Sequence, residues 1–261
     1  MESIETGGQL LGAVREVVGT FGNAWWRGQP AGKQLLPGAY RCDGTHRMEW
    51  LRVTRFMQKA AMRQSAVPRP EEYAHWLFLM QHHRLPTRLL DWTESPLVAC
   101  FFAVSSDNRS EDALLWALDP VGLNDYQLEE IGCFPGVGLV PGSRTPGPGG
   151  NTFLEVSDFI EPAFQQNEYD APVYKRVLAL LTPETNVRML QQQSVFTAHG
   201  TRVPMEELNK CERFLRSFTI PAAAKTILWK ELLWLGIRES SLYPDLDHLA
   251  LDVCQTIALT S

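Results

Sequence analysis

Residues 81–103 read QHHRLPTRLLDWTESPLVACFFA, and this stretch carries the clearest structural and functional signals of the chain. Its first part is dense in imidazoles, guanidiniums, carboxylates and hydroxyls. Ser95-Pro96 then supplies an N-cap hydroxyl and a proline at the first helical position, which predicts a buried apolar helix through Val104. Polar groups at this density beside a core helix are typical of a functional site.

Upstream, the run Trp25-Trp26-Arg27-Gly28-Gln29 places a lone arginine after two indoles and before a glycine. A short strand is predicted at Ala24–Arg27, ended by Gly28 and Pro30. Two interpretations of Arg27 stay open: a buried ion pair with Asp91 or a later glutamate, or a group that binds an anion or a carbonyl. Gly28 would allow a positive φ or the close approach of a ligand.

Apolar periodicity along the rest of the chain indicates mixed secondary structure. Helices are predicted over residues 8–21, 47–64, 71–82, 123–131, 222–235 and 244–257. Strands are predicted over 112–119 and 213–220, with short strand-like or turn-flanked pieces at 153–156 and 187–190. Because strands and helices do not alternate strictly, we expect one α+β domain over residues 1–261 rather than a doubly wound sheet.

Residues 133–151 are rich in glycine and proline, so they predict a long loop, either a surface excursion or a lid that closes on a ligand. The formal charge of −6 argues against a strongly basic nucleic-acid-binding protein. Five scattered cysteines without a Cys-x-x-Cys pair favour neither a disulfide framework nor a zinc site. With no leader pattern and no membrane-length apolar run, we expect a cytoplasmic protein without a membrane partner.

His82 and His83 fall at the end of a predicted helix. No His-x-x-x-His or Glu-x-x-His spacing accompanies them, so no metal site is predicted. One of the two is expected to cap helix carbonyls, and the other to hydrogen-bond a ligand or to act as a general acid or base.

The next polar residues have structural and functional interpretations that both stay open. Arg88 and Asp91 are close enough in sequence for a local ion pair. Thr93 and Ser95 cap the following helix, or Thr93 and Trp92 form a cleft wall where a hydroxyl orients a sugar and an indole stacks on a ring.

Three glutamines, residues 191–193, follow Arg188 and precede an apolar pair. A side-chain amide is useful where a site must donate and accept hydrogen bonds without carrying charge. A solvated turn is the alternative interpretation.

These segments resemble the FRG domain, a family named for an aromatic-Arg-Gly signature. The resemblance extends from Trp25 to about Leu249 and rests on Trp26–Gln29, Gln81–Pro96, the segment from Arg188 to Thr197, and a tail with Pro221, Lys225, Leu232, Gly236, Ile237, Pro244, Asp245 and Leu246. The chain departs from the family pattern at Trp26, where Phe or Tyr is usual, and at Arg84 and Ser194, where glycine is expected. Glycine at the last two positions would serve a positive φ.

The resemblance also implies a chemistry. The order of the arginine, hydroxyl and glutamine motifs is similar to the arginine, hydroxyl and acid order of ADP-ribosyltransferase-like folds, which implies a split β-sheet with flanking helices. In that analogy Arg27, Thr93 and Gln192 are the catalytic residues. Arg27 holds the phosphates or ribose of NAD, Thr93 or Ser95 orients the nicotinamide ribose, Trp92 stacks on nicotinamide, and Gln192 replaces a glutamate. The residues expected to bind NAD are Arg27, Gly28, Gln29, His82, His83, Arg88, Trp92 and Ser95.

The resulting hypothesis is an NAD-dependent ADP-ribosyltransferase-like enzyme, an effector or toxin of a bacterial conflict or phage-defence system. It would have a protein or nucleic-acid acceptor and an antitoxin or immunity partner. Glutamine cannot act as a general base, so strong NAD hydrolysis is not expected. The alternative is a non-catalytic sensor module that binds a nucleotide or a protein, and a metal-dependent hydrolase using His82, His83 and Asp91 ranks below both.

Overall fold

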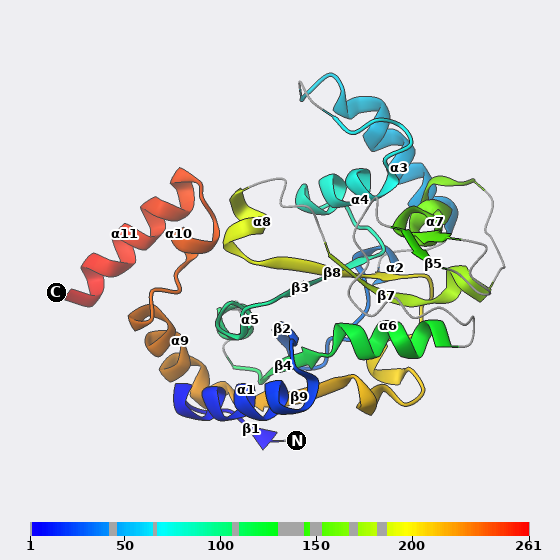
Figure 1. Cartoon of the computed structure of the whole chain (residues 1–261). Coiled ribbons are helices and arrows are strands. Elements are labelled where there is room, and N and C mark those ends of the chain that lie inside the picture. Colours follow the sequence, from blue (N-terminus) through cyan, green and yellow to red (C-terminus); the bar gives the residue numbers. More distant parts are fainter. Residues whose placement is uncertain are drawn as a thin grey trace.

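Figure 1 shows the computed structural model of the chain, which describes residues 2–41, 46–64, 67–105, 110–129, 144–146, 153–166, 172–181 and 187–260. The strands are β1 (Glu2–Ser3), β2 (Trp25–Pro30), β3 (Leu89–Thr93), β4 (Ala113–Leu118), β5 (Arg144–Pro146), β6 (Phe153–Glu155), β7 (Val177–Leu180), β8 (Ser194–His199) and β9 (Leu215–Ile220). The helices are α1 (Gly7–Phe21), α2 (Gly38–Arg41), α3 (His46–Ala60), α4 (Tyr73–His82), α5 (Pro96–Val104), α6 (Pro120–Leu128), α7 (Val156–Ile160), α8 (Val187–Gln191), α9 (Lys225–Trp234), α10 (Glu239–Leu242) and α11 (Leu246–Thr260).

Seven strands form one mixed sheet in the order β1-β9-β4-β2-β3-β8-β7, and β5 pairs with β6 separately. All neighbouring pairs in the large sheet are antiparallel except β1 with β9. The pairing of β2 with β3 consists of a single register pair, Trp26 with Thr93. By contrast, β2 and β4 are in register along all of β2. The sheet is therefore nearly split between β2 and β3.

The split divides the core on one face of the sheet. One apolar cluster packs α1, α5 and α9 against β4 and β9, and it includes Trp26 of β2. A second cluster packs α3, α4 and α7 against β3, β7 and β8, and it includes Leu89. The single pair between Trp26 and Thr93 places both clusters on the same face, because side chains alternate along each strand. A gap is left between them.

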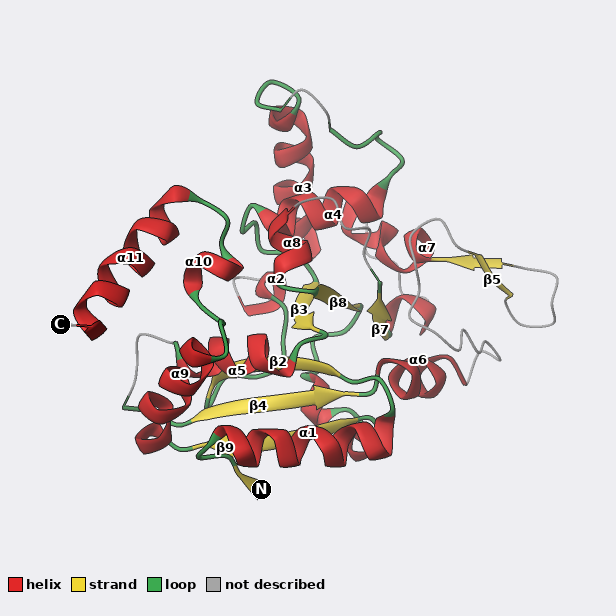
Figure 2. Cartoon of the chain, turned by 60° about the vertical axis from the view of Figure 1, so that its left-hand side comes forward, coloured by secondary structure: helices red, strands yellow, loops and turns green. Residues whose placement is uncertain are grey.

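The opposite face of the sheet carries a third apolar cluster. Alternate residues of β3 and β4, such as Leu90, Trp92 and Leu118, meet Leu123 of α6 there. Figure 2 shows α1 and α6 beside the sheet, with α3 and α11 reaching outward from the body in different directions. The chain is thus a single α+β domain in which helices pack against one mixed sheet, as predicted.

Most predicted elements are present, with shifted ends. The predicted strand at Ala24–Arg27 runs on through Gly28 and ends at Pro30 as β2, so Gly28 does not interrupt it. Pro30 is the last residue of β2, where the missing amide hydrogen costs little. The strand-like prediction at 187–190 is wrong, because these residues form α8. Of the Gly/Pro-rich loop at 133–151, only residues 144–146 are described, and they form β5.

Besides the short β1 and β5, three longer strands were not predicted from the sequence, namely β3, β7 and β8. Apart from the exposed Asp91 of β3, these strands are largely buried on both faces, so apolar residues do not alternate regularly with exposed ones. Short apolar runs of this kind do not distinguish strand from helix. Residues 81–103 therefore comprise the end of α4, the central strand β3 and nearly all of α5.

Candidate functional site

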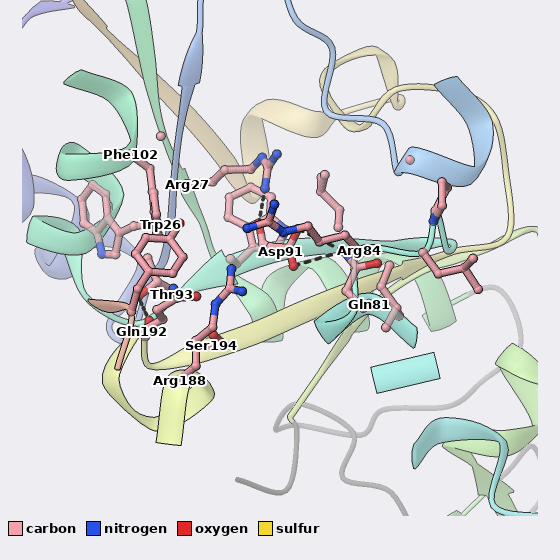
Figure 3. Close-up of a pocket in the computed structure, with 18 of the residues that line it drawn as sticks. Trp26, Arg27, Gln81, Arg84, Asp91, Thr93, Phe102, Arg188, Gln192 and Ser194 are labelled. Carbon is pink, nitrogen blue, oxygen red and sulfur yellow. Dashed lines mark hydrogen bonds between the residues drawn. The ribbon is translucent and has the colours of Figure 1, made fainter. Parts of the chain in front are cut away.

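A cavity of about 490 Å³ occupies the gap between the two clusters, where β2 and β3 diverge. Figure 3 shows the side chains around it. Its lining comes from β2, β3, α4, α5, α8 and the segment before β3, and it comprises Trp26, Arg27, Gly28, Gly38, Arg41, Gln81, Arg84, Leu85, Pro86, Leu89, Leu90, Asp91, Trp92, Thr93, Phe102, Arg188, Gln192, Ser194 and Tyr243. The cavity therefore brings Arg27, Thr93 and Gln192 to one place, although they are far apart in the sequence.

Arg27 lies at the point where the ladder between β2 and β3 stops. Continuing the antiparallel register would pair Gly28 with Asp91. Instead, Nη1 of Arg27 donates to the main-chain oxygen of Asp91 at 2.6 Å, and Nε donates to Oε1 of Gln29 at 3.1 Å. Burial lowers the pKa of Arg27 to about 10, Asp91 opposes that shift, and the charge of Arg41 adds to it. The side chain remains a cation at neutral pH, and it replaces the missing backbone pairing.

The predicted ion pair of Arg27 with a carboxylate is therefore corrected, since the partner is a main-chain carbonyl. The Asp91 carboxylate is held from another direction. Nε2 of Gln81 donates to both of its oxygens at 3.1 and 3.0 Å, and Thr87 Oγ1 donates to Gln81 Oε1 at 2.5 Å. This chain of hydrogen bonds fixes the carboxylate at the cavity while leaving Asp91 exposed.

The charge of the cavity wall is strongly positive. Among the described residues that line it, Asp91 is the only acid, while four are arginines: Arg27, Arg41, Arg84 and Arg188. Figure 3 shows the side chains of Arg27, Arg84 and Arg188 directed toward the space beside Asp91. In a protein with a net charge of −6, this concentration of guanidiniums makes the cavity locally cationic.

Two of these arginines are placed by local structure. Arg84 has φ of +61°, which turns the chain sharply after α4 and accords with the glycine that the family pattern has there. Arg188, on α8, lies over the ring of Tyr243 with its guanidinium carbon 4.7 Å from the ring centroid. At Ser194, where glycine was also expected, the positive φ belongs to the preceding residue, Gln193, with φ of +46°.

Thr93 and Gln192 are hydrogen-bonded to each other, and their polar side-chain groups bond to other parts of the protein. Thr93 Oγ1 donates to the main-chain oxygen of Gln192 at 2.7 Å and accepts from the amide of Ser95 at 3.0 Å. The Gln192 side-chain amide donates to the main-chain oxygen of Leu242 at 3.1 Å. These bonds join β3, the turn before β8 and α10, so both residues brace one wall of the cavity.

Gly28 lines the cavity but does not have the positive φ that its sequence context allowed. Its α-carbon faces the backbone of α5. A Cβ at this position would lie 1.9 Å from the carbonyl oxygen of Ala99 and 2.6 Å from the amide nitrogen of Ala103. The glycine therefore permits α5 to pack directly on β2, and this packing sets one wall of the cavity.

Several residues predicted to bind NAD do not line the cavity: Gln29, His82, His83, Arg88 and Ser95. Gln29 is buried, and its amide donates to the main-chain oxygen of Lys33 at 2.6 Å. Ser95 caps α5 by accepting from the amide of Val98 at 3.3 Å. The helix-capping interpretation of Ser95 is thus the one observed.

Arg88 and Trp92 belong to the interior. Arg88 donates to both carboxylate oxygens of Glu49 at 3.0 and 2.8 Å, so the predicted pair with Asp91 does not form. The indole of Trp92 is 3% exposed and donates to Thr197 Oγ1 at 3.1 Å on the face of the third cluster. Trp92 therefore has a core position instead of the predicted place for stacking on a ring.

His82 and His83 lie near the cavity without lining it. Burial, together with His83 and Arg188, lowers the pKa of His82. His83 instead lines a separate groove beside α3. His199 is a further buried imidazole: burial, with the charges of Arg27 and Arg41, lowers its pKa to about 3. It is neutral at physiological pH, with Nε2 2.9 Å from Thr197 Oγ1.

Sequence reasoning named Asp91 as an ion-pair partner and, in the lower-ranked hydrolase alternative, as a metal ligand, and it did not assign Gln81, Arg41, Arg84 or Tyr243 to the site. Asp91 offered the clearest signal. A charged residue within the apolar run from Leu89 to Thr93 must face a cavity or a partner if that run is a buried strand. Recognising Leu89–Thr93 as a buried strand would have identified Asp91 as a residue of the cavity.

No cluster of three or more His, Cys, Asp or Glu side chains suited to a metal ion occurs in the part of the chain that the structure describes. Within those same residues, none of the helices combines the length and the apolarity that a membrane crossing requires.

The two segments that meet at the split, β2 and the stretch around β3, are also those that a family comparison selects. Residues 22–112 match the FRG domain. The match contains the aromatic-Arg-Gly strand and the Gln81–Pro96 motif, and it ends before the Arg188 and Gln192 segment of the cavity. No curated protein and no solved structure matches the chain. The matched residues thus include Asp91 and three of the four arginines of the cavity wall, and Arg188 and Gln192 lie beyond them.

Proposed function

We propose that the cavity binds NAD and that the protein is an NAD-dependent ADP-ribosyltransferase-like enzyme, acting as an effector or toxin in a bacterial conflict or phage-defence system. The observation that carries the proposal is the set of four arginines around one fixed carboxylate in the split of the sheet. NAD offers a diphosphate to the guanidiniums and ribose hydroxyls to the carboxylate. Guanidinium forks match phosphate oxygens well, because they donate two parallel hydrogen bonds.

Each wall of the cavity has a role in this proposal. Arg84 and Arg188 would bind the diphosphate, with Arg27 linking β2 to β3 through the Asp91 carbonyl and adding positive charge. Phe102 and Tyr243 supply the aromatic surface that was expected from Trp92. Thr93 and Gln192 would act as positioning residues, since their polar groups fix the wall rather than pointing unpartnered into the cavity.

The ADP-ribosyltransferase analogy expects a glutamate where this chain has Gln192. We propose that the Asp91 carboxylate takes the role of that acid. In the proposed reaction, the bond between the ribose C1′ and the nicotinamide nitrogen breaks, and nicotinamide leaves with the bonding electron pair. Asp91 would accept a hydrogen bond from a ribose hydroxyl and stabilise the positive charge that develops on the sugar. An acceptor nucleophile then bonds to C1′, and its proton passes to Asp91 or to water.

Calorimetric titration of the full chain with NAD tests the binding step. Arg84→Ala and Arg188→Ala should each weaken binding by about tenfold or more, since a hydrogen bond to a charged group contributes about 1.5–3 kcal/mol. Arg15→Ala is the matched control, because Arg15 is an exposed arginine of α1 that does not line the cavity. Absence of NAD binding by the wild type, or equal weakening in the control, would contradict the proposal.

Nicotinamide release and transfer of label from NAD to a cell extract test the chemistry. Asp91→Asn should lower the rate by about 100-fold or more, while the Kd for NAD changes only a few-fold. A chain that binds NAD but gives neither product is instead a sensor module. The internal use of the Thr93 and Gln192 polar groups is the observation that favours this second candidate.

A further inference from the structure

A second hollow lies on the outer side of α4. It is a groove of about 680 Å³ between α3 and α4, with Leu51, Arg52, Arg55, Phe56, Lys59, Ala60, Arg63, Gln64, Leu79, His83 and Leu85 as its lining. Figures 1 and 2 both show α3 projecting from the body of the protein at this side. The groove is separate from the NAD cavity, although Leu85 lines both.

The groove combines an apolar floor with a basic rim. Four cations follow one face of α3 and the turn after it, at residues 52, 55, 59 and 63. No acid lines the groove among the described residues. The acid of α3, Glu49, is already neutralised by Arg88 in the interior. Nη1 of Arg52 is buried and has no hydrogen-bond partner in the part of the chain that the structure describes.

A groove of this kind fits an acidic helix with an apolar stripe. The apolar floor accepts aliphatic side chains spaced at i, i+3 and i+7, and the cations meet carboxylates on the flanks of the helix. A nucleic-acid backbone would satisfy the cations but would leave the floor of Phe56, Ala60 and Leu79 without apolar contacts. The chemistry of the groove therefore favours a protein helix.

The chain itself contains such a helix. The sequence from Asp245 to the end of α11 contains three aspartates and no lysine or arginine. Leu246, Leu249 and Val253 form a stripe at the required spacing, and they are 80%, 47% and 49% exposed. These exposed fractions show that α11 does not bury its apolar stripe against its own protomer.

The opposite side of α11 is the one attached to the protein. Asp252 accepts a hydrogen bond from Ser240 at 2.5 Å and lies 3.8 Å from a guanidinium nitrogen of Arg238. His248 stacks on Tyr243 with ring centroids 4.4 Å apart. These contacts direct the apolar stripe toward solvent, with Asp247 exposed on its flank.

We infer that α11 of one copy docks in the α3–α4 groove of a second copy. Leu246, Leu249 and Val253 fill the apolar floor, and Asp247 on the flank of α11 meets the basic rim. The groove and helix of one protomer lie at separate ends of the molecule in both views, so the contact joins two copies (Figures 1 and 2). Such a contact uses different surfaces on the two partners, and it closes as a dimer when each copy exchanges its helix.

A labelled peptide of residues 244–261 is the direct probe, added to the full chain and followed by fluorescence anisotropy. We expect saturable binding that weakens with salt, because screening acts on exposed charges. Arg55→Glu combined with Lys59→Glu should weaken binding roughly tenfold or more. Lys33→Glu combined with Lys230→Glu is the control, since both lysines are exposed, lie outside the groove and change the net charge equally. A peptide carrying Leu249→Asp should not bind.

Light scattering after size exclusion then tests self-association of the full chain. The wild type should gain mass with concentration, whereas the groove variant, with Arg55→Glu and Lys59→Glu, and an Asp247→Arg helix variant should each remain smaller. Mixing these two variants should restore association, because the reversed helix then meets the reversed groove. A monomer at every concentration without peptide binding overturns the inference. Association that persists in the groove variant overturns it as well. So does loss of peptide binding in the control variant with Lys33→Glu and Lys230→Glu.

Discussion

The substitution Gly28→Ala tests how directly α5 packs on β2. The added Cβ would lie 1.9 Å from the Ala99 oxygen, 2.6 Å from the Ala103 nitrogen and 2.9 Å from the Ala103 Cβ. Ordinary contact begins near 3.4 Å, so α5 must move away by more than an ångström. The obstructing atoms belong to the backbone of a buried helix and cannot rotate aside. Overpacking of this kind typically costs about 1–3 kcal/mol, and this site belongs at the upper end.

Chemical denaturation followed by tryptophan fluorescence measures this loss, since the chain has eight tryptophans. A loss of about 3 kcal/mol should also lower Tm by roughly 6–12 °C in a protein of this size. Gly19→Ala is the matched control. Gly19 lies in α1, and a Cβ there would have no neighbour within 4 Å, so alanine should stabilise the protein by about 0.5–1 kcal/mol.

Replacing glycine by alanine is thus expected to lower the free energy of unfolding at Gly28 and to raise it at Gly19. If Gly28→Ala leaves the free energy of unfolding within about 0.5 kcal/mol of the wild type, the close contact of α5 with β2 is refuted. The packing argument for the cavity wall would then fail with it. In the folded variant, a displaced α5 should also weaken NAD binding, because Phe102 on this helix lines the cavity.

Three further outcomes are expected. Arg88→Ala leaves the Glu49 carboxylate buried and unpaired, so it should cost about 3–5 kcal/mol in urea denaturation, and a cost below 1 kcal/mol contradicts the buried pair. The lowered pKa of His199 means that the unfolded chain binds its proton first as pH falls below 6.5; stability is complete above that pH and is lost toward pH 3 by up to about 1.4 kcal/mol per pH unit. His199→Gln should flatten that slope in denaturation curves, and an unchanged slope assigns it to other groups. Ser95→Ala removes the cap from Val98 and should cost about 1 kcal/mol of stability without changing the Kd for NAD, which a calorimetric comparison checks.

Local chemistry made part of the site predictable. Ser95-Pro96 marks the start of α5, because a capping hydroxyl and a proline act within one turn of the helix. The aromatic-Arg-Gly run at β2 and the Gln81–Pro96 motif indicated where a site would lie, and both segments border the cavity. The roles of individual side chains were less predictable, since Trp92, Ser95 and Arg88 are used within the protein.

The sequence by itself determined the helices with strong periodicity, the capped start of α5, and the grouping of polar residues around β3. Only the tertiary structure decided that Arg88 pairs with Glu49, that Gln81 holds Asp91, and that the sheet opens between β2 and β3. The physical reason is range. Caps and periodicity depend on neighbours within a few residues, whereas the partner of a buried charge is set by which distant elements pack together, and many partners are compatible with the same local pattern.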